Sequence, residues 1–298
     1  MSETLPLQVS FEFFPPKTEK MKEQLWSSVE RLAPLNPSFI SVTYGAGGST
    51  RGRTHETVKR IISETGLQTA AHLTCVNATR AEVNEVLEDY WQAGVRHIVA
   101  LRGDPPEGIG GQYVETKGGY KNAAELAQGA RELHDFEITV GCYPEKHPES
   151  PDYQLDIELL KQKVDAGATR AITQFFYSND VYFRYLEKVR AAGISIPIVP
   201  GIMPVLNFAS LQKMAKMCGT TIPQKIFRMF EHLDDDPETR QMVAATLAAD
   251  QCLDLSDQGI SQFHFYTLNR AEMAFALCHM LGVRPDPDAL PVKKETAA

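Results

Sequence analysis

Short runs of β-branched and aromatic residues recur along the chain and alternate with segments of helical spacing. Leu25, Val29 and Leu32, with charged residues between them, are typical of an amphipathic helix. Such segments separate about eight short apolar runs. We therefore predict strands at Leu7–Phe13, Phe39–Tyr44, Thr69–Thr74, Arg96–Leu101, Ile138–Tyr143, Ala171–Phe176, Ile196–Ile202 and Gln262–Tyr266.

Glycine follows several predicted helices directly before the next strand. Gly94, Gly167 and Gly193 stand where a left-handed residue ends a helix and begins an αβ turn. Regular alternation of strand and helix predicts a parallel sheet. We predict an α/β fold, a single (β/α)8 TIM barrel over residues 1–298 with a frayed tail from about residue 285. An open doubly wound sheet is the alternative.

Polar residues gather where the predicted strands end. In a barrel these ends meet on one face, where the βα loops build the active site. His72 could instead be a hydrogen-bonded core histidine, and Asp104 a turn residue before Pro105. Their joint placement favours a functional site. The residues at these ends include Glu12, Thr43, Tyr44, His72, Arg102, Gly103, Asp104, Tyr143, His147, Gln174 and Arg270.

Glu12 lies within an apolar run, between Phe11 and Phe13, and two prolines follow it. A carboxylate among phenylalanines loses hydration, so we expect its pKa to rise from about 4.3 towards neutrality. A group with such a pKa can act as a general acid. The alternatives are an edge-strand glutamate that faces water and one that pairs with a lysine or arginine elsewhere in the chain.

Composition and charge indicate which binding partners and which cellular compartment to expect. The net charge of -8 and the lack of a basic stripe argue against nucleic-acid binding. The 5 cysteines are widely spaced and form no Cys-x-x-Cys pair, which is typical of reduced thiols in a cytosol. The amino terminus has no apolar signal segment, and no apolar run reaches about 18 residues. We expect a cytoplasmic protein that does not bind membranes.

Several common chemistries lack their sequence signatures. The glycine loop Gly45–Gly48 has neither the third glycine of a dinucleotide-binding loop nor a Walker A lysine. The first predicted strand carries one carboxylate and no histidine, so we expect no metal site. No Gly-x-Ser-x-Gly elbow is present. Cys75 and Cys142 lie near strand ends, but their apolar neighbours favour buried, inert thiols.

Six motifs at these strand ends, in order along nearly the whole chain, resemble one family. They are Phe11-Glu12-Phe13-Phe14-Pro15-Pro16, Ser41-Val42-Thr43-Tyr44-Gly45-Ala46, His72-Leu73-Thr74-Cys75, Ala100-Leu101-Arg102-Gly103-Asp104, Ile172-Thr173-Gln174-Phe175-Phe176 and Phe265-Tyr266-Thr267-Leu268-Asn269-Arg270. This set is similar to the bacterial 5,10-methylenetetrahydrofolate reductases. The resemblance implies an FAD-containing (β/α)8 barrel in which a hydride passes from NADH or NADPH to flavin and then to methylenetetrahydrofolate.

The resemblance also implies roles for individual residues. Glu12 would donate a proton to the nitrogen released when the folate ring opens, and Asp104 would act electrostatically on flavin and pterin. Gln174 would contact folate and nicotinamide, and Arg270 the folate carboxylates. Leu159 and Gln162 stand where some relatives carry Asn and Arg near the FAD phosphates. The FAD-binding positions would be Thr43, Tyr44, Ala46, His72, Arg102, Gly103, Asp104, Tyr120, Tyr143, His147, Asp156 and Lys163.

The same resemblance predicts a homo-oligomer, either dimer or tetramer, and no regulatory domain. Two rival functions stay open. One is another FAD-linked barrel, such as a proline dehydrogenase. The other is a non-catalytic barrel that binds folate or flavin, against which the joint presence of Glu12, Asp104 and Gln174 argues.

Overall fold

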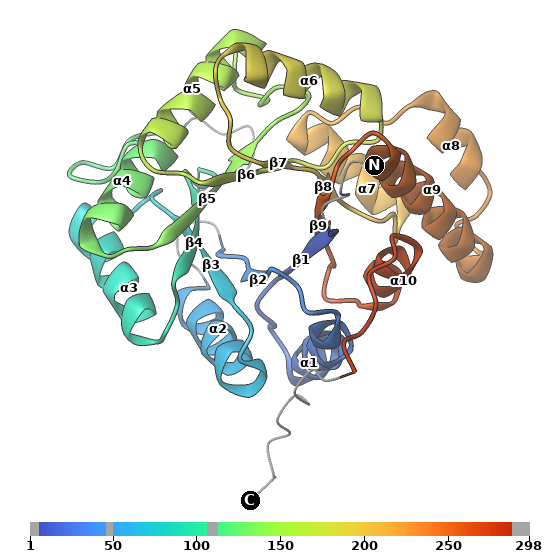
Figure 1. The fold of residues 1–298 in the computed structure, drawn as a ribbon, viewed down its shortest axis with the longest axis horizontal. Coiled ribbons are helices and arrows are strands. Elements are labelled where there is room, and N and C mark those ends of the chain that lie inside the picture. The colour runs from blue at the N-terminus through green and yellow to red at the C-terminus, as the bar shows by residue number, and fades with distance from the viewer. Residues whose placement is uncertain (1–5, 46–49, 106–112, 288–298) are drawn as a thin grey trace, which may run out of the picture.

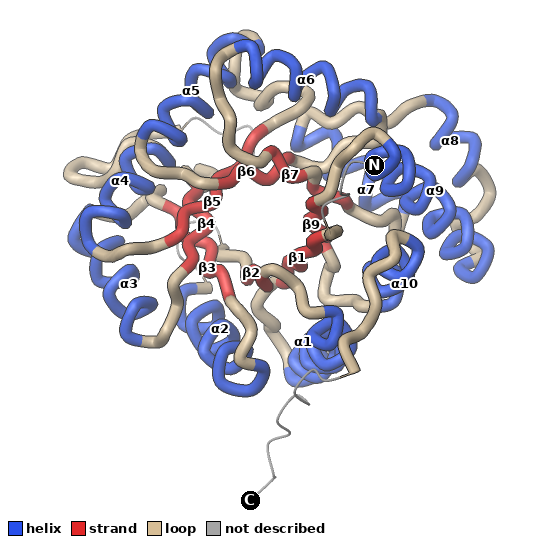
Figure 2. The backbone as a smooth tube through the Cα atoms, viewed as in Figure 1, coloured by secondary structure: helices blue, strands red, loops and turns tan. Residues whose placement is uncertain are grey.

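The computed structural model describes residues 6–45, 50–105 and 113–287. Within these ranges nine parallel strands form one sheet, in the order β7-β6-β5-β4-β3-β2-β1-β9-β8, which curls into a barrel (Figure 2). The strands are β1 (Gln8–Phe13), β2 (Phe39–Val42), β3 (Thr69–Thr74), β4 (His97–Leu101), β5 (Glu137–Cys142), β6 (Arg170–Thr173), β7 (Ile198–Val199), β8 (Gly201–Ile202) and β9 (Gln262–Tyr266).

The helices surround the barrel (Figure 1). Three of them, α7, α8 and α9, lie between β8 and β9 in the chain. The helices are α1 (Glu19–Leu32), α2 (Arg51–Thr65), α3 (Arg80–Gln92), α4 (Ala123–Leu133), α5 (Tyr153–Asp165), α6 (Asn179–Ala191), α7 (Phe208–Cys218), α8 (Gln224–Phe230), α9 (Pro237–Asp257) and α10 (Glu272–Met280), with a 3-10 turn at Ala33–Leu35. Across the described ranges, no helix is both long and apolar enough to span a membrane.

The predicted barrel is confirmed, and its seventh strand is divided in two. Pro200 separates β7, which pairs with β6, from β8, which pairs with β9. Proline has no backbone N–H to donate, so it interrupts the ladder. Its carbonyl still accepts a hydrogen bond from His264 N at 3.0 Å. The two short strands therefore close the ring as one interrupted strand.

Local capping chemistry sets several element boundaries. Thr79 and Glu82 form a capping box that starts α3, and the Asn122 side chain accepts from two backbone N–H groups to start α4. Gly94 and Gly167 have φ of 90° and 105°, as predicted for the turns after α3 and α5. Near the predicted tail, Asp286 N donates to Pro34 O at 2.7 Å, so the chain is still attached to the barrel there. Residues 288–298 lie outside the described ranges.

Strand alternation separates an outer apolar layer from a mixed barrel interior. Phe11 and Phe13 are both 0% exposed, and Phe11 stacks on Phe265 with ring centroids 6.1 Å apart, in the layer beneath the helices. Inside, one cluster joins five strands: Phe39, Ala70, Val99, Ile172 and Val199. His264 stacks on Phe39 at 5.8 Å, so β9 presents this imidazole to the interior.

Candidate active site

Two histidines flank the Glu12 carboxylate inside the barrel. Nε2 of His72 lies 3.3 Å from Glu12 Oε2, and Nε2 of His264 lies 3.6 Å from the same oxygen. The three residues come from β1, β3 and β9. The Glu12 side chain keeps 19% of its exposure, whereas the His264 side chain has none. One side of the carboxylate therefore stays open to the face where ligands can enter.

The predicted rise in the pKa of Glu12 is wrong. Burial does raise this pKa, but the imidazoles of His264 and His72 beside the carboxylate outweigh it and lower the pKa to about 2. The prediction assumed phenylalanine neighbours, yet Phe11 and Phe13 point to the opposite side of β1. Glu12 is thus a carboxylate in the ligand-free chain.

A second layer orients His264. Ser10 Oγ lies 2.8 Å from His264 Nδ1, and it also donates to the carbonyl of Phe263 at 3.3 Å. Burial lowers the pKa of His264, although the Glu12 charge opposes this shift. The contact with Ser10 holds the Nδ1 edge of the ring, so its Nε2 edge is directed at Glu12.

The loop after β9 clamps the end of β1. Thr267 donates its backbone N–H and its hydroxyl to the carbonyl of Glu12, at 3.2 and 2.6 Å. Asn269 donates to the Phe14 carbonyl and accepts from Phe14 N, both at 2.9 Å. Thr267 and Asn269 belong to the motif from Phe265 to Arg270, in which the family resemblance implies a role for Arg270 alone. The structure gives Thr267 and Asn269 the task of holding Glu12.

A cavity of about 410 Å³ opens beside this cluster, at the ends of β3, β4 and β5. Thr74, two residues after His72 on β3, lines it, so β3 carries side chains of both the cavity and the Glu12 cluster. The cavity brings together many of the predicted cofactor residues: Tyr44, Arg102, Gly103, Asp104, Tyr143, His147, Asp156 and Lys163. Leu159 and Gln162 line it as well.

Two cations face the cavity. Arg102 forms a two-point ion pair with Glu149, at 2.7 and 3.0 Å. Lys163 Nζ donates to the carbonyl of Gly141 at 2.9 Å, and burial lowers its pKa. A buried ammonium held by a neutral carbonyl is suited to receive an anionic ligand.

Carboxylates and tyrosines complete the wall. Asp156 accepts from His147 N at 2.6 Å and from the Ser150 hydroxyl, so this carboxylate organises the loop after β5. Burial raises the pKa of Tyr143, and the nearby charges of Cys218 and Asp104 add to the rise. The Asp104 carboxylate therefore lies close enough to Tyr143 for its charge to be felt there.

Besides Glu12 and Tyr120, four predicted site residues of the described structure do not line this cavity. Thr43 directly follows β2, and its carbonyl accepts from the Thr54 hydroxyl at 3.0 Å. Gln174 follows β6, and its backbone N donates to Cys142 O at 2.7 Å. Arg270 lines a separate cavity of about 360 Å³ together with Tyr266. His72 belongs to the Glu12 cluster, and Ala46 lies outside the described residues.

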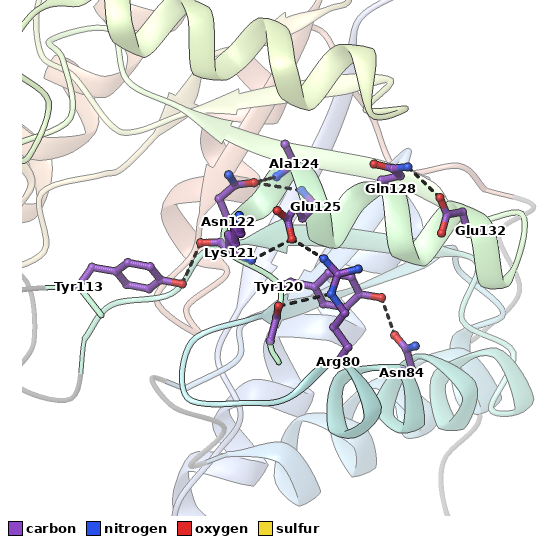
Figure 3. A network of polar contacts seen from close by, with 11 residues as sticks. Arg80, Asn84, Tyr113, Tyr120, Lys121, Asn122, Ala124, Glu125, Gln128 and Glu132 are labelled. Carbon is purple, nitrogen blue, oxygen red and sulfur yellow. Dashed lines mark hydrogen bonds and ion pairs between the residues drawn. The ribbon is translucent and has the colours of Figure 1, made fainter. Parts of the chain in front are cut away.

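Tyr120 does not line the cavity. Its side chain is 4% exposed, its hydroxyl donates to Asn84 at 2.7 Å, and the Arg80 guanidinium lies 4.7 Å from its ring centre (Figure 3). Because Gly129 has no side chain, the Tyr120 ring can pack directly against α4. The side chain thus fixes the chain between α3 and α4, and its contact with FAD stays a prediction.

Sequence reasoning missed Glu149 and the start of α4. Asn122, Ala123 and Ala124 line the cavity. Asn122, three residues before Glu125, is a helix-start signal that could have identified this wall. For Glu149 no local signal exists, because its partner Arg102 follows β4 and lies 47 positions earlier in the chain. As expected, Cys75 and Cys142 are buried, and burial raises their pKa values to about 11 and about 12.

Ionisable groups at the carboxyl ends of barrel strands, beside a cavity that presents two cations, are typical of an α/β-barrel enzyme. The family model for methylenetetrahydrofolate reductase matches residues 3–282. The chain belongs to this family of oxidoreductases.

Individual relatives agree with this assignment. The 5,10-methylenetetrahydrofolate reductase of Pectobacterium carotovorum subsp. carotovorum is 51% identical over 282 residues, which cover 94% of this chain and 92% of that protein. The enzyme of that name from Escherichia coli (strain K12) is 50% identical over 279 residues, with the same coverage of 94% and 92%.

A solved structure shares the fold. It is an uncharacterized protein from Clostridium thermocellum described as binding two copies of 5-methyl-5,6,7,8-tetrahydrofolic acid. Its TM-score is 0.60 at 12% identity, over 93% of this chain and 95% of that chain. At this identity the likeness concerns the barrel alone.

Proposed function

We propose that the chain reduces 5,10-methylenetetrahydrofolate to 5-methyltetrahydrofolate, with FAD as bound cofactor and NADH or NADPH as electron donor. The reaction is ping-pong through FAD, and both half-reactions are reversible. One observation carries the proposal: β3 carries both His72, which contacts the Glu12 carboxylate, and Thr74, which lines a cavity with two cations. This arrangement supports a proton-handling group next to a nucleotide-binding site.

The residues present fit FAD. Lys163 and Arg102 offer positive charge to a pyrophosphate, and the start of α4 lines the same cavity. Tyr44 and Tyr143 supply aromatic surface. His147 and Asp156 hold the loop after β5 in place. Leu159 and Gln162 stand where some relatives carry Asn and Arg, so Leu159 lacks the amide and Gln162 lacks the charge. We therefore expect Arg102 and Lys163 to bind most of the phosphate charge.

When bound, FAD supplies hydride transfer to and from carbon. The chain positions the reactants around it. Asp104 places a negative charge at the cavity wall, where we assign it to electrostatic tuning and to a hydrogen bond with the pterin edge. Gln174, at the end of β6, contacts folate or nicotinamide, whichever occupies the site.

Glu12 delivers the proton that ring opening of methylenetetrahydrofolate requires at the departing nitrogen. Since its pKa is about 2 without ligand, it must take up this proton when substrate binds. A bound pterin that excludes water from the open side of the carboxylate disfavours its charged form and raises the pKa. Throughout this step, the Thr267 hydroxyl donates to the backbone carbonyl of Glu12 and so keeps the residue in position.

Arg270 meets the carboxylates of folate. It lies three residues after Thr267, and both residues line the second cavity together with Tyr266. An extended substrate whose pterin lies at Glu12 can therefore place its acidic end against Arg270.

Anaerobic mixing tests the proposal. NADH should bleach the flavin absorbance of the purified protein, and methylenetetrahydrofolate should then restore it. Bleaching by proline instead of folate-dependent recovery would identify a proline dehydrogenase. A preparation that neither contains nor takes up FAD would support the non-catalytic barrel. The predicted homo-oligomer belongs to the same proposal, and sedimentation velocity would measure its size.

A further inference from the structure

The ion pair between Arg102 and Glu149 bridges two separate parts of the cavity wall. Arg102 follows β4, whereas Glu149 belongs to the loop between β5 and α5. Both guanidinium nitrogens Nη1 and Nη2 donate, one to each oxygen of the carboxylate, at 2.7 and 3.0 Å. The side chains are 26% and 31% exposed. This planar two-point geometry fixes the direction of a guanidinium better than a single contact does.

Arg102 is supported on two further sides. Its guanidinium lies 4.4 Å from the ring centre of Tyr113, and its Nε donates to Gly103 O at 3.3 Å. Tyr113 is itself anchored, because its hydroxyl donates to Lys121 O at 3.0 Å (Figure 3). The guanidinium is thus held between an aromatic face, a carbonyl and a carboxylate.

Glu149 is held by the loop that carries it. Its backbone N donates to His147 Nδ1 at 3.1 Å, and His147 N donates to Asp156 Oδ2 at 2.6 Å. The Ser150 hydroxyl also donates to Asp156. These bonds tie residues 147–150 to the first turn of α5, so the carboxylate of Glu149 starts from a fixed backbone.

We propose that Glu149 is a positioning residue for phosphate binding, which holds the Arg102 guanidinium so that its remaining N–H groups face the cavity. A guanidinium has five N–H donors. Glu149 takes two and Gly103 takes one, which leaves two for the pyrophosphate of FAD. The inference rests on the proposed function, since it takes FAD as the ligand, and it needs no displacement of Glu149.

The Glu149 carboxylate also carries a negative charge near the phosphates. Its repulsion of the phosphates therefore competes with its orientation of Arg102. Repulsion is weakened because Arg102 neutralises Glu149 at contact distance, and Lys163 adds a positive charge on another wall. Without Glu149, the long arginine side chain would lose its fixed direction and its two charge-assisted bonds. Orientation therefore outweighs repulsion, and the carboxylate strengthens phosphate binding.

Glu149→Gln tests this inference, with FAD and riboflavin as the two probes. Flavin-free protein is titrated with each, and circular dichroism verifies the fold. We expect Kd for FAD to rise about tenfold. Kd for riboflavin, which has no phosphate, should stay within about twofold, because the isoalloxazine site is untouched. Glu158→Gln removes the same charge from the outer face of α5, where Glu158 accepts from Gln154, and should change neither value.

Other outcomes separate the possible failures. An unchanged or lower Kd for FAD in Glu149→Gln would overturn the inference, since the carboxylate would then be idle or a competitor. A parallel rise for FAD and riboflavin would also overturn it, because it would show a general structural role. If wild-type protein binds neither flavin, the proposed function itself fails. A double-mutant cycle with Arg102→Lys should be strongly non-additive, as expected for two residues that act together.

Discussion

Thr267 donates both its hydroxyl and its backbone N–H to the carbonyl oxygen of Glu12, so the loop after β9 fixes the backbone that carries the site carboxylate. We predict that Thr267→Val lowers folate turnover about ten- to a hundredfold through misplacement of Glu12, with the NADH half-reaction little changed. Thr267→Ser keeps the hydroxyl and should restore turnover. Stopped-flow measurement of each half-reaction checks this. Equal losses in both half-reactions would contradict the positioning role.

Replacement of the carboxylate itself should separate the half-reactions further. In Glu12→Gln we expect bleaching by NADH to continue, while folate turnover falls by roughly three decades, at the upper end of general-acid effects. The amide cannot supply the proton for ring opening. Loss of the NADH step to the same extent would remove Glu12 from the donor role and leave it as a structural partner of His72 and His264.

Acid sensitivity should follow from buried histidines. Burial and the Arg170 charge lower the pKa of His97 from 6.5 to about 3 in the folded chain. Between these values the unfolded chain binds the extra proton, so this contribution to stability is complete above pH 6.5 and falls as pH decreases. The loss is about 1.4 kcal/mol per pH unit for one proton. His264, whose pKa is also lowered, adds a loss of the same sign.

Urea unfolding at pH 7 and pH 5 would measure this. His97→Gln should reduce the pH dependence by close to one proton, whatever it does to stability at pH 7. His232→Asn is the matched control, because the His232 side chain is 92% exposed and asparagine tolerates its φ of 60°. A slope in His97→Gln equal to that of wild type would show that His97 is not the group that titrates.

A positive charge can be added to the cavity wall at Gln162. Gln162 lines it on α5, the helix that also carries Lys163. We expect Gln162→Arg to tighten FAD binding severalfold, because a guanidinium there adds a second donor fork for phosphate. Fluorescence titration at low and high salt would show a larger gain at low salt. Gln154→Arg, on an exposed part of the same helix, controls for net charge.

The barrel and much of the site could be predicted from sequence, because strand period, glycine turns and motifs at strand ends are local signals. Strand bounds agree within a few residues, apart from the interruption at Pro200. The rest depends on long-range contacts. The pKa of Glu12 depends on His264, about 250 residues away in the chain. The role of Tyr120 depends on Asn84 and Gly129, which neighbour it only after α3 and α4 pack.

The pairing of β1 with β9 has a consequence for how the protein matures. Ser10 and His264, which meet across this pair, are separated by 254 positions. Glu12 is therefore made early on the ribosome, but its histidine partner and its Thr267 clamp emerge near the end of synthesis. Contacts between such distant segments form slowly. Ring closure and assembly of the Glu12 cluster are thus one event, and a nascent or half-closed barrel would lack this cluster altogether.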